Sequence, residues 1–378
     1  MAMQENDLLL EVKNLYVDYQ AGNGSVHAVR DVNLTLKRGE ILGLAGESGC
    51  GKSTLAFGIA RLLRPPAMIT GGEILYHSRP QAERKGEMVA ARQDRHASKE
   101  EIVDVLELTS SQLRAFRWNE LSVVFQSAMN ALNPVMTIGT QIIDGIKAHR
   151  PDMGAAACQK RAAELLDLVG IAPDRLRSYP HELSGGMRQR AVIAIALALN
   201  PELIIMDEPT TALDVVVQRE ILELISKLCK EFSTALIFIT HDLSLLLELA
   251  DKIAIMYAGA MIEKGTSKDV YLHPRHPYSY GLLHSFPTLT GPRRRMVGIP
   301  GSPPDLRMIA QGCPFSERCP LAFDPCRSVT PELLPAVANN PEQTVACHLY
   351  NTKYNETVPG EERFAQGYEA LAEGRTAR

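Results

Sequence analysis

The first forty residues alternate between apolar and polar positions with a period of two. Residues 8–12, 26–29 and 32–36 show this pattern, and a polar turn at 37–40 leads into the apolar segment 41–45. Alternation is typical of strands with one buried face, whereas a short apolar run suits a strand buried on both faces. We therefore expect several strands with one buried face, followed by the first strand of a buried sheet.

Farther along the chain the apolar positions follow the helical period, and short β-branched runs separate the helices. Ile138, Ile142 and Ile146 repeat on one face of a predicted helix. The runs 204–206 and 236–239 suit strands buried in a parallel sheet. Helices are predicted over residues 53–63, 137–182, 187–199 and 215–232. This order of elements indicates an α/β fold with a helical subdomain at about 137–200.

Two stretches interrupt this pattern. Residues 79–101 are polar, carry both signs of charge and lack periodicity, so we interpret them as a solvated excursion between two strands, with a docking role as the alternative. After residue 266 prolines become frequent and no long periodic helix is visible. We expect one large domain over 1–265, a small irregular domain over 266–350 and a polar tail over 351–378.

Composition and charge exclude some classes of protein. The chain has 378 residues, of which 45% are hydrophobic and 22% charged, close to the average for globular proteins. Its net charge of −4 gives no reason to expect nucleic acid as a partner, because that usually requires a basic face. The longest apolar run, 191–199, is too short to cross a bilayer, and the N-terminus lacks the order of a signal peptide. We expect any membrane contact to go through a partner.

A glycine-rich loop after the strand 41–45 carries the first chemical motif. Gly46, Gly51, Lys52 and Ser53 have the spacing of a phosphate-binding loop, and a predicted helix follows at once. Backbone N–H groups of such a loop surround phosphate oxygens, Lys supplies charge and Ser a hydroxyl for Mg²⁺. The expected nucleotide-binding residues here are Gly46, Ser48, Gly49, Cys50, Gly51, Lys52, Ser53 and Thr54. We interpret Cys50 as a small residue of the loop rather than a redox switch.

Polar residues at the ends of three later strands predict the rest of a hydrolytic site. Asp207 is placed to hold Mg²⁺ with Ser53, and Glu208 to act as a general base toward water. Gln126 can reach both metal and water, and His241 can reach a γ-phosphate. Tyr19 is the candidate for stacking on a nucleotide base, and Tyr16 is its competitor. Asp207, Gln126 and Ser53 are thus the expected Mg²⁺ ligands.

A second predicted helix N-terminus is a candidate anion-binding site. Ser184, Gly185 and Gly186 precede the predicted helix 187–199, and the two glycines let phosphate oxygens approach the backbone. A well-capped helix without a ligand is the alternative reading.

Four of the seven cysteines crowd near the C-terminus, at Cys313, Cys319, Cys326 and Cys347. Their spacings lack the tight pairs of structural zinc sites and match neither common ferredoxin pattern. From the residues alone an iron–sulfur cluster, zinc, and unligated or disulfide-linked thiols all stay open.

Taken in order, these motifs resemble those of the ATP-binding subunits of ABC transporters. In that family's terms they are, in turn, the Walker A loop (46–54), the Q-loop (Gln126), the signature (183–187), Walker B (203–208), the D-loop (212–214) and the switch histidine (His241). The resemblance implies a P-loop ABC ATPase fold with a RecA-like core, an antiparallel β subdomain and a helical subdomain. It implies hydrolysis of ATP with Mg²⁺, and adds Asp214 to the nucleotide-binding residues.

Further segments are similar to the oligopeptide and dipeptide importer branch. They lie at 131–137, 276–278, 299–304 and 312–320, and the likeness covers nearly the whole chain except 79–101. It implies a head-to-tail pair of ATPase subunits, often a heterodimer, with each phosphate loop facing the other subunit's signature. It also implies two permeases, an extracytoplasmic solute-binding protein, and a peripheral place on the cytoplasmic face of the cell's inner membrane.

The resemblance also implies a [4Fe-4S] cluster at Cys313, Cys319, Cys326 and Cys347, in a Cys-rich C-terminal domain. Peptides are the default solute of this branch, with nickel, glutathione and sugars as alternatives. A non-transport ATPase acting on nucleic acid is a further alternative, but its usual coiled coils, zinc modules and basic surfaces are not evident.

Overall fold

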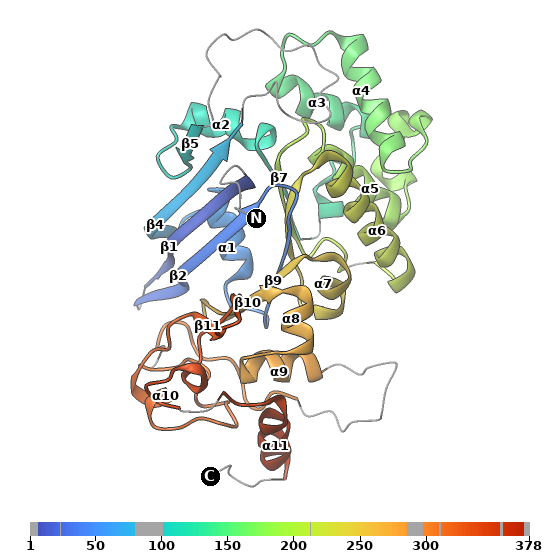
Figure 1. Cartoon of the computed structure of the whole chain (residues 1–378). Coiled ribbons are helices and arrows are strands. Elements are labelled where there is room, and N and C mark those ends of the chain that lie inside the picture. Colours follow the sequence, from blue (N-terminus) through green and yellow to red (C-terminus); the bar gives the residue numbers. More distant parts are fainter. Residues whose placement is uncertain are drawn as a thin grey trace.

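Two β-sheets form the frame of the chain (Figure 1). The structure is a computed structural model that describes residues 7–22, 24–79, 101–126, 128–211, 213–285, 298–309, 311–355 and 358–373. The smaller sheet is antiparallel, and its strands in spatial order are β2 (Gly24–Lys37), β1 (Leu8–Ala21), β4 (Ala67–Ser78) and β5 (Glu101–Asp104).

The larger sheet combines a parallel centre with an antiparallel edge. Its parallel strands in spatial order are β9 (Lys252–Tyr257), β3 (Ile41–Ala45), β8 (Ala235–Ile239), β7 (Leu203–Asp207) and β6 (Leu121–Val124). Beyond β9 the sheet continues with the antiparallel strands β10 (Ala260–Thr266), β12 (Asn340–Val345) and β11 (Leu334–Val337). Every residue of β3, β7 and β8 is buried, which explains their unbroken apolar sequences.

Helices cover the large sheet and form a separate helical part. Helix α1 (Lys52–Ile59) contacts strands of both sheets and lies between them (Figure 1). The helical part consists of α3 (Ile138–His149), α4 (Ala155–Leu168) and α5 (Gly185–Ala196), which pack on one another. The remaining α-helices are α2 (Ser110–Asn119), α6 (Val215–Phe232), α7 (Leu243–Leu249), α8 (Ser267–Leu272), α9 (Pro277–His284), α10 (Pro325–Ser328) and α11 (Glu361–Ala372). Among the described segments, no helix combines the length and apolarity needed to span a bilayer.

Two large apolar clusters hold these layers together. One joins the antiparallel sheet, through Leu9 and Leu34, to α1 and to one face of the parallel strands, through Ile205. The other joins the opposite face, through Phe238, to the helical part, through Ile142 and other buried side chains. A sheet buries an apolar face only by packing it against another layer. Here α1 packs between the two sheets, so the loop that joins β3 to α1 lies at the edge of this packed interior. The predicted α/β fold with an antiparallel β layer is confirmed.

The separate irregular domain expected over 266–350 is not supported. Strand β12 pairs with β10, with Val345 opposite Glu263, so this segment extends the sheet of the preceding domain. The side chain of Glu263 is fully buried there, and its carboxylate accepts hydrogen bonds from the backbone N–H groups of Arg275 (2.7 Å) and His276 (2.9 Å). Burial raises the pKa of Glu263 to about 7, although these hydrogen bonds oppose that shift.

The tail expected over 351–378 contains a packed helix. Phe364 and Tyr368 lie one turn apart on α11, and both are almost completely buried in a small cluster with Tyr280 of α9. Because most residues of the tail are polar, its composition gave no indication that Phe364 and Tyr368 form a buried face. Of the polar stretch 79–101, residues 80–100 lie outside the described part, and the flanking strands β4 and β5 pair with Ser78 opposite Glu101.

Candidate active site

The phosphate loop connects β3 to α1 through a backbone that requires glycine. Gly46, Gly49 and Gly51 have φ angles of 144°, 80° and 105°, all in the region that disfavours other residues. A Cβ atom on Gly46 would lie 2.3 Å from the carbonyl oxygen of Met256, and one on Gly51 would lie 2.2 Å from that of Ala28. The loop is therefore pressed against β9 and β2, and its glycines permit that approach.

Lys52 holds the loop in shape from inside. Its side chain is buried, and its ammonium donates to the carbonyl oxygens of Gly46 (2.8 Å) and Glu47 (3.0 Å). Cys50 is 4% exposed, and burial raises the pKa of its thiol. This environment supports the interpretation of Cys50 as a small packed residue. Ser48 and Gly49 form the exposed rim of the loop.

Asp207 and Ser53 meet beneath the loop. Asp207 ends β7, is 2% exposed, and receives a hydrogen bond from the Ser53 hydroxyl. Burial raises the pKa of Asp207, and the hydrogen bond from Ser53 opposes that shift. Its Oδ1 atom is buried without a protein partner. A hydroxyl and a carboxylate oxygen with spare acceptor capacity are hard donors, so this pair fits Mg²⁺.

The carboxylate of Glu208 contacts the side chains of the other predicted catalytic residues, Gln126 and His241. Its Oε2 atom accepts from Gln126 Nε2 (3.1 Å), and its Oε1 atom lies 3.2 Å from Nδ1 of His241. The hydroxyl of Thr211 also donates to Oε2 at 3.1 Å. The structure thus brings Gln126, Glu208 and His241 together from the ends of three parallel strands. The sequence interpretation missed Thr211, since a threonine three residues after the acid carries no distinct signal.

Tyr19 lies on β1, and its side chain reaches the start of α1. Its hydroxyl is 3.1 Å from Oγ1 of Thr54, the last residue of the loop motif. Tyr16 is 39% exposed and packs beside Gly71. This position favours Tyr19 over Tyr16 as the residue near a bound nucleotide.

Ser184 and Asp214 are helix N-caps on the exposed surface. The hydroxyl of Ser184 accepts from the N–H of Met187 (3.3 Å) at the start of α5. The carboxylate of Asp214 accepts from Val216 (3.1 Å) and Val217 (3.0 Å) at the start of α6. Gly185 and Gly186 form the first residues of α5, which lies apart from α1 in Figure 1. Ala212 of the predicted D-loop lies outside the described residues.

The iron–sulfur cluster implied by the resemblance is not supported. Cys313, Cys319, Cys326 and Cys347 are free thiols, and burial raises the pKa of each. They are close enough to influence one another electrostatically. Within the part of the chain that is described, however, no three His, Cys, Asp or Glu side chains form a group that could hold a metal ion.

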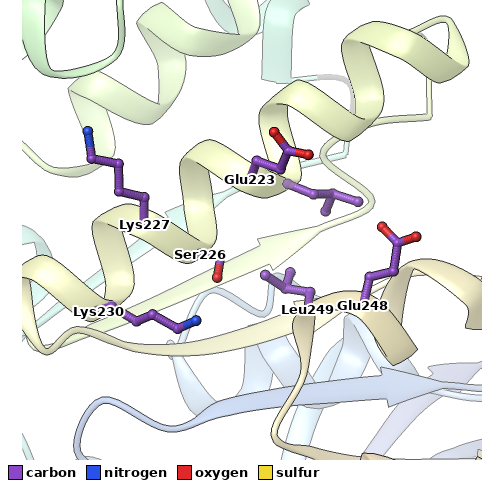
Figure 2. Close-up of a pocket in the computed structure, with 7 residues that line it drawn as sticks. Glu223, Ser226, Lys227, Lys230, Glu248 and Leu249 are labelled. Carbon is purple, nitrogen blue, oxygen red and sulfur yellow. The ribbon is translucent and has the colours of Figure 1, made fainter.

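The surface also has an open groove of about 320 Å³ between α6 and α7 (Figure 2). Its lining combines two lysines, two glutamates and three uncharged residues, namely Leu222, Glu223, Ser226, Lys227, Lys230, Glu248 and Leu249. No residue of the phosphate loop lines it, so the groove is distinct from the candidate active site.

Two family models match the chain. The model described as ABC transporter matches residues 29–211, which include the phosphate loop and Glu208. The model described as oligopeptide/dipeptide transporter, C-terminal region, matches residues 262–326.

Named relatives extend over most of the chain. The oligopeptide transport ATP-binding protein OppD of Escherichia coli is 41% identical over 88% of this chain and 91% of its own length. The dipeptide transport ATP-binding protein DppD of Bacillus subtilis is 40% identical over 93% of this chain and 97% of its own length. Among solved structures, an ATP-binding cassette in a dimeric post-hydrolysis state with ADP and Pi is 28% identical. It covers 68% of this chain and 99% of its own, with a TM-score of 0.55.

Proposed function

This chain belongs to the ATP-binding subunits of ABC importers for oligopeptides and dipeptides, and we propose that it hydrolyses ATP at the phosphate loop, Asp207 and Glu208. The observation that carries this assignment of residues is the convergence of Gln126 and His241 on the carboxylate of Glu208. Hydrolysis at this site energises peptide uptake.

The loop and its neighbours bind the nucleotide. Backbone N–H groups of Ser48 to Thr54 and the N-terminus of α1 surround the phosphates, and Lys52 turns its ammonium from the loop carbonyls toward the β and γ phosphates. Tyr19 stacks on the adenine. Ser53, Asp207 and Gln126 would hold Mg²⁺, and the ion would neutralise charge on the phosphates.

Glu208 carries the chemical step. Its carboxylate accepts a proton from the water whose oxygen attacks the γ-phosphorus, and the bond from that phosphorus to the ADP oxygen breaks. Gln126 and Thr211 donate to the same carboxylate oxygen and fix its direction, while His241 contacts the other oxygen. His241 is half-exposed, so its imidazole is free to meet the γ-phosphate.

A second ATPase subunit completes the site. Ser184 is exposed at the N-terminus of α5, and α5 lies apart from α1, the helix that follows the phosphate loop (Figure 1). In a head-to-tail pair, often a heterodimer in this branch, that N-terminus and Asp214 close over the nucleotide of the partner. The pair lies at the cytoplasmic face of the inner membrane and acts with two permeases and an extracytoplasmic solute-binding protein.

The [4Fe-4S] cluster is an implication of the family resemblance alone, because the described thiols form no group that could hold a metal ion. Iron and sulfide analysis of protein purified without oxygen tests it directly. Four iron atoms per chain would retain the cluster at Cys313, Cys319, Cys326 and Cys347, and a colourless protein without iron would remove it.

Reconstitution with the permeases tests the transport function. We expect ATP turnover in proteoliposomes to rise several-fold when the solute-binding protein is loaded with a peptide, because substrate-loaded partners favour closure of the ATPase pair. Nickel, glutathione and sugars provide the matched comparison. Stimulation by one of these and not by peptides would change the solute, and the absence of stimulation by any solute would contradict coupling to import.

A further inference from the structure

The C-terminal segment holds the phosphate loop through an arginine. The two terminal nitrogens of Arg318 donate to the two carboxylate oxygens of Glu47, at 2.7 and 2.9 Å. The Nε atom of Arg318 donates to the carbonyl oxygen of Pro300 (2.7 Å), and the side chain is 6% exposed. A bidentate pair with so little solvent around the arginine is geometrically specific. It joins residues separated by 271 positions.

A tyrosine from the same region contacts the same loop residue. The hydroxyl of Tyr278, which is fully buried, accepts a hydrogen bond from the backbone N–H of Glu47 at 2.8 Å. The rings of Tyr257 and Tyr278 lie 4.7 Å apart, and Tyr257 Oη accepts from Arg318 at 3.2 Å. The arginine and the tyrosine therefore belong to one packed unit.

Tyr278 is itself held from the sheet. The buried carboxylate of Glu263 on β10 fixes the backbone N–H groups of Arg275 and His276. The neutral ring of His276 then accepts from the N–H of Tyr278 (3.0 Å), and burial lowers the pKa of His276 to about 3. A continuous series of hydrogen bonds therefore runs from Glu263 on the sheet, through His276 and Tyr278, to Glu47 in the loop.

We propose that Arg318 and Tyr278 are positioning residues for ATP binding, which hold the phosphate loop in its nucleotide-competent shape through Glu47. We call these two residues the Glu47 clamp. Glu47 is bonded at three points: its N–H by Tyr278, its carboxylate by Arg318, and its carbonyl oxygen by the ammonium of Lys52. When ATP arrives and draws Lys52 to its phosphates, the clamp is what retains Glu47 in place.

This proposal rests on the proposed function, since it concerns the same nucleotide site. It assigns a purpose to the C-terminal segment, which contributes the two clamp residues and otherwise lies outside the ATPase motifs. Without the clamp, the loop must be ordered by the nucleotide itself, and that ordering cost weakens binding.

The test is a double-mutant cycle on ATP affinity in the full chain, measured with a fluorescent ATP analogue and without permeases. We expect Arg318→Met and Glu47→Gln each to weaken binding about tenfold, and the double variant to bind no more weakly than either alone. Tyr278→Phe removes only the hydroxyl acceptor and should cost about threefold. In the assembled importer, KM for ATP should rise while kcat stays within about twofold, because Glu208 is untouched.

Arg307→Met is the matched control. Arg307 pairs with Asp305 in the same segment, but both side chains are exposed, so its loss should leave ATP affinity unchanged. Unchanged affinity in Arg318→Met, or additive losses in the double variant, would overturn the proposal. If Arg318→Met does not fold, Glu47→Gln and Tyr278→Phe, which conserve side-chain size, decide the question. A failure of peptide-coupled hydrolysis in the wild type would refute the proposed function and leave the affinity comparison intact.

Discussion

Replacing Glu208 with glutamine is expected to lower ATP turnover by about 100-fold or more, while ATP binding is retained. Glutamine has the same shape and can still bond to Gln126 and Thr211, but it cannot accept a proton from water. A general base contributes about 100-fold to 10,000-fold to a rate. Single-turnover hydrolysis in the assembled importer, with binding of an ATP analogue measured in parallel, gives both quantities.

The matched control for that variant is Glu220→Gln. Glu220 is an exposed carboxylate that pairs with Arg190 at 2.8 Å on the helical side of the molecule. The same charge is removed there, so turnover should stay near the wild-type rate. Wild-type hydrolysis in Glu208→Gln would take the role of base away from Glu208.

Replacing Lys52 with methionine is expected to weaken ATP binding and to lower ATP turnover by about 100-fold or more. Methionine fills the buried stem of the side chain but has no ammonium. The carbonyl oxygens of Gly46 and Glu47 lose their donor, and the phosphates lose a positive charge that other residues of the loop do not supply. ATP affinity and turnover are measured on the same preparation.

Lys227→Met controls for the loss of a lysine as such. Lys227 is exposed on α6 at the groove of Figure 2, and its replacement should change neither ATP affinity nor turnover. Equal losses in the two variants would indicate a general effect of charge rather than a role for Lys52 at the phosphates.

Local sequence patterns predicted those parts of the fold that depend on neighbours in the chain. The strand 41–45 and the helix 215–232 have the predicted bounds, because their apolar periods and polar ends are complete within a few residues. The two strands expected at 26–29 and 32–36 are instead one strand, β2. Asp31 between them has a φ of 48°, so the polar break is an irregularity within a continuing strand rather than a turn.

Contacts between distant segments could not be predicted in this way. The acidic, glutamine and histidine positions were found because each follows a recognisable strand, and parallel strands end at one edge of a sheet. Arg318 and Glu47 have no such signal, since an arginine in a proline-rich segment gives no indication of which carboxylate it meets. The buried face of α11 was missed for a similar reason, because its large buried side chains, Phe364 and Tyr368, stand in an otherwise polar stretch.

We propose that ATP is hydrolysed between two subunits, with the exposed Ser184 at the start of α5 of one facing the phosphate loop of the other. The most direct measurement is ATP turnover by the isolated chain at concentrations where sedimentation shows a single species. We expect turnover about 100-fold or more below that of the assembled importer, rising with concentration as pairs form. A demonstrably monomeric chain that hydrolyses ATP as fast as the importer would contradict it.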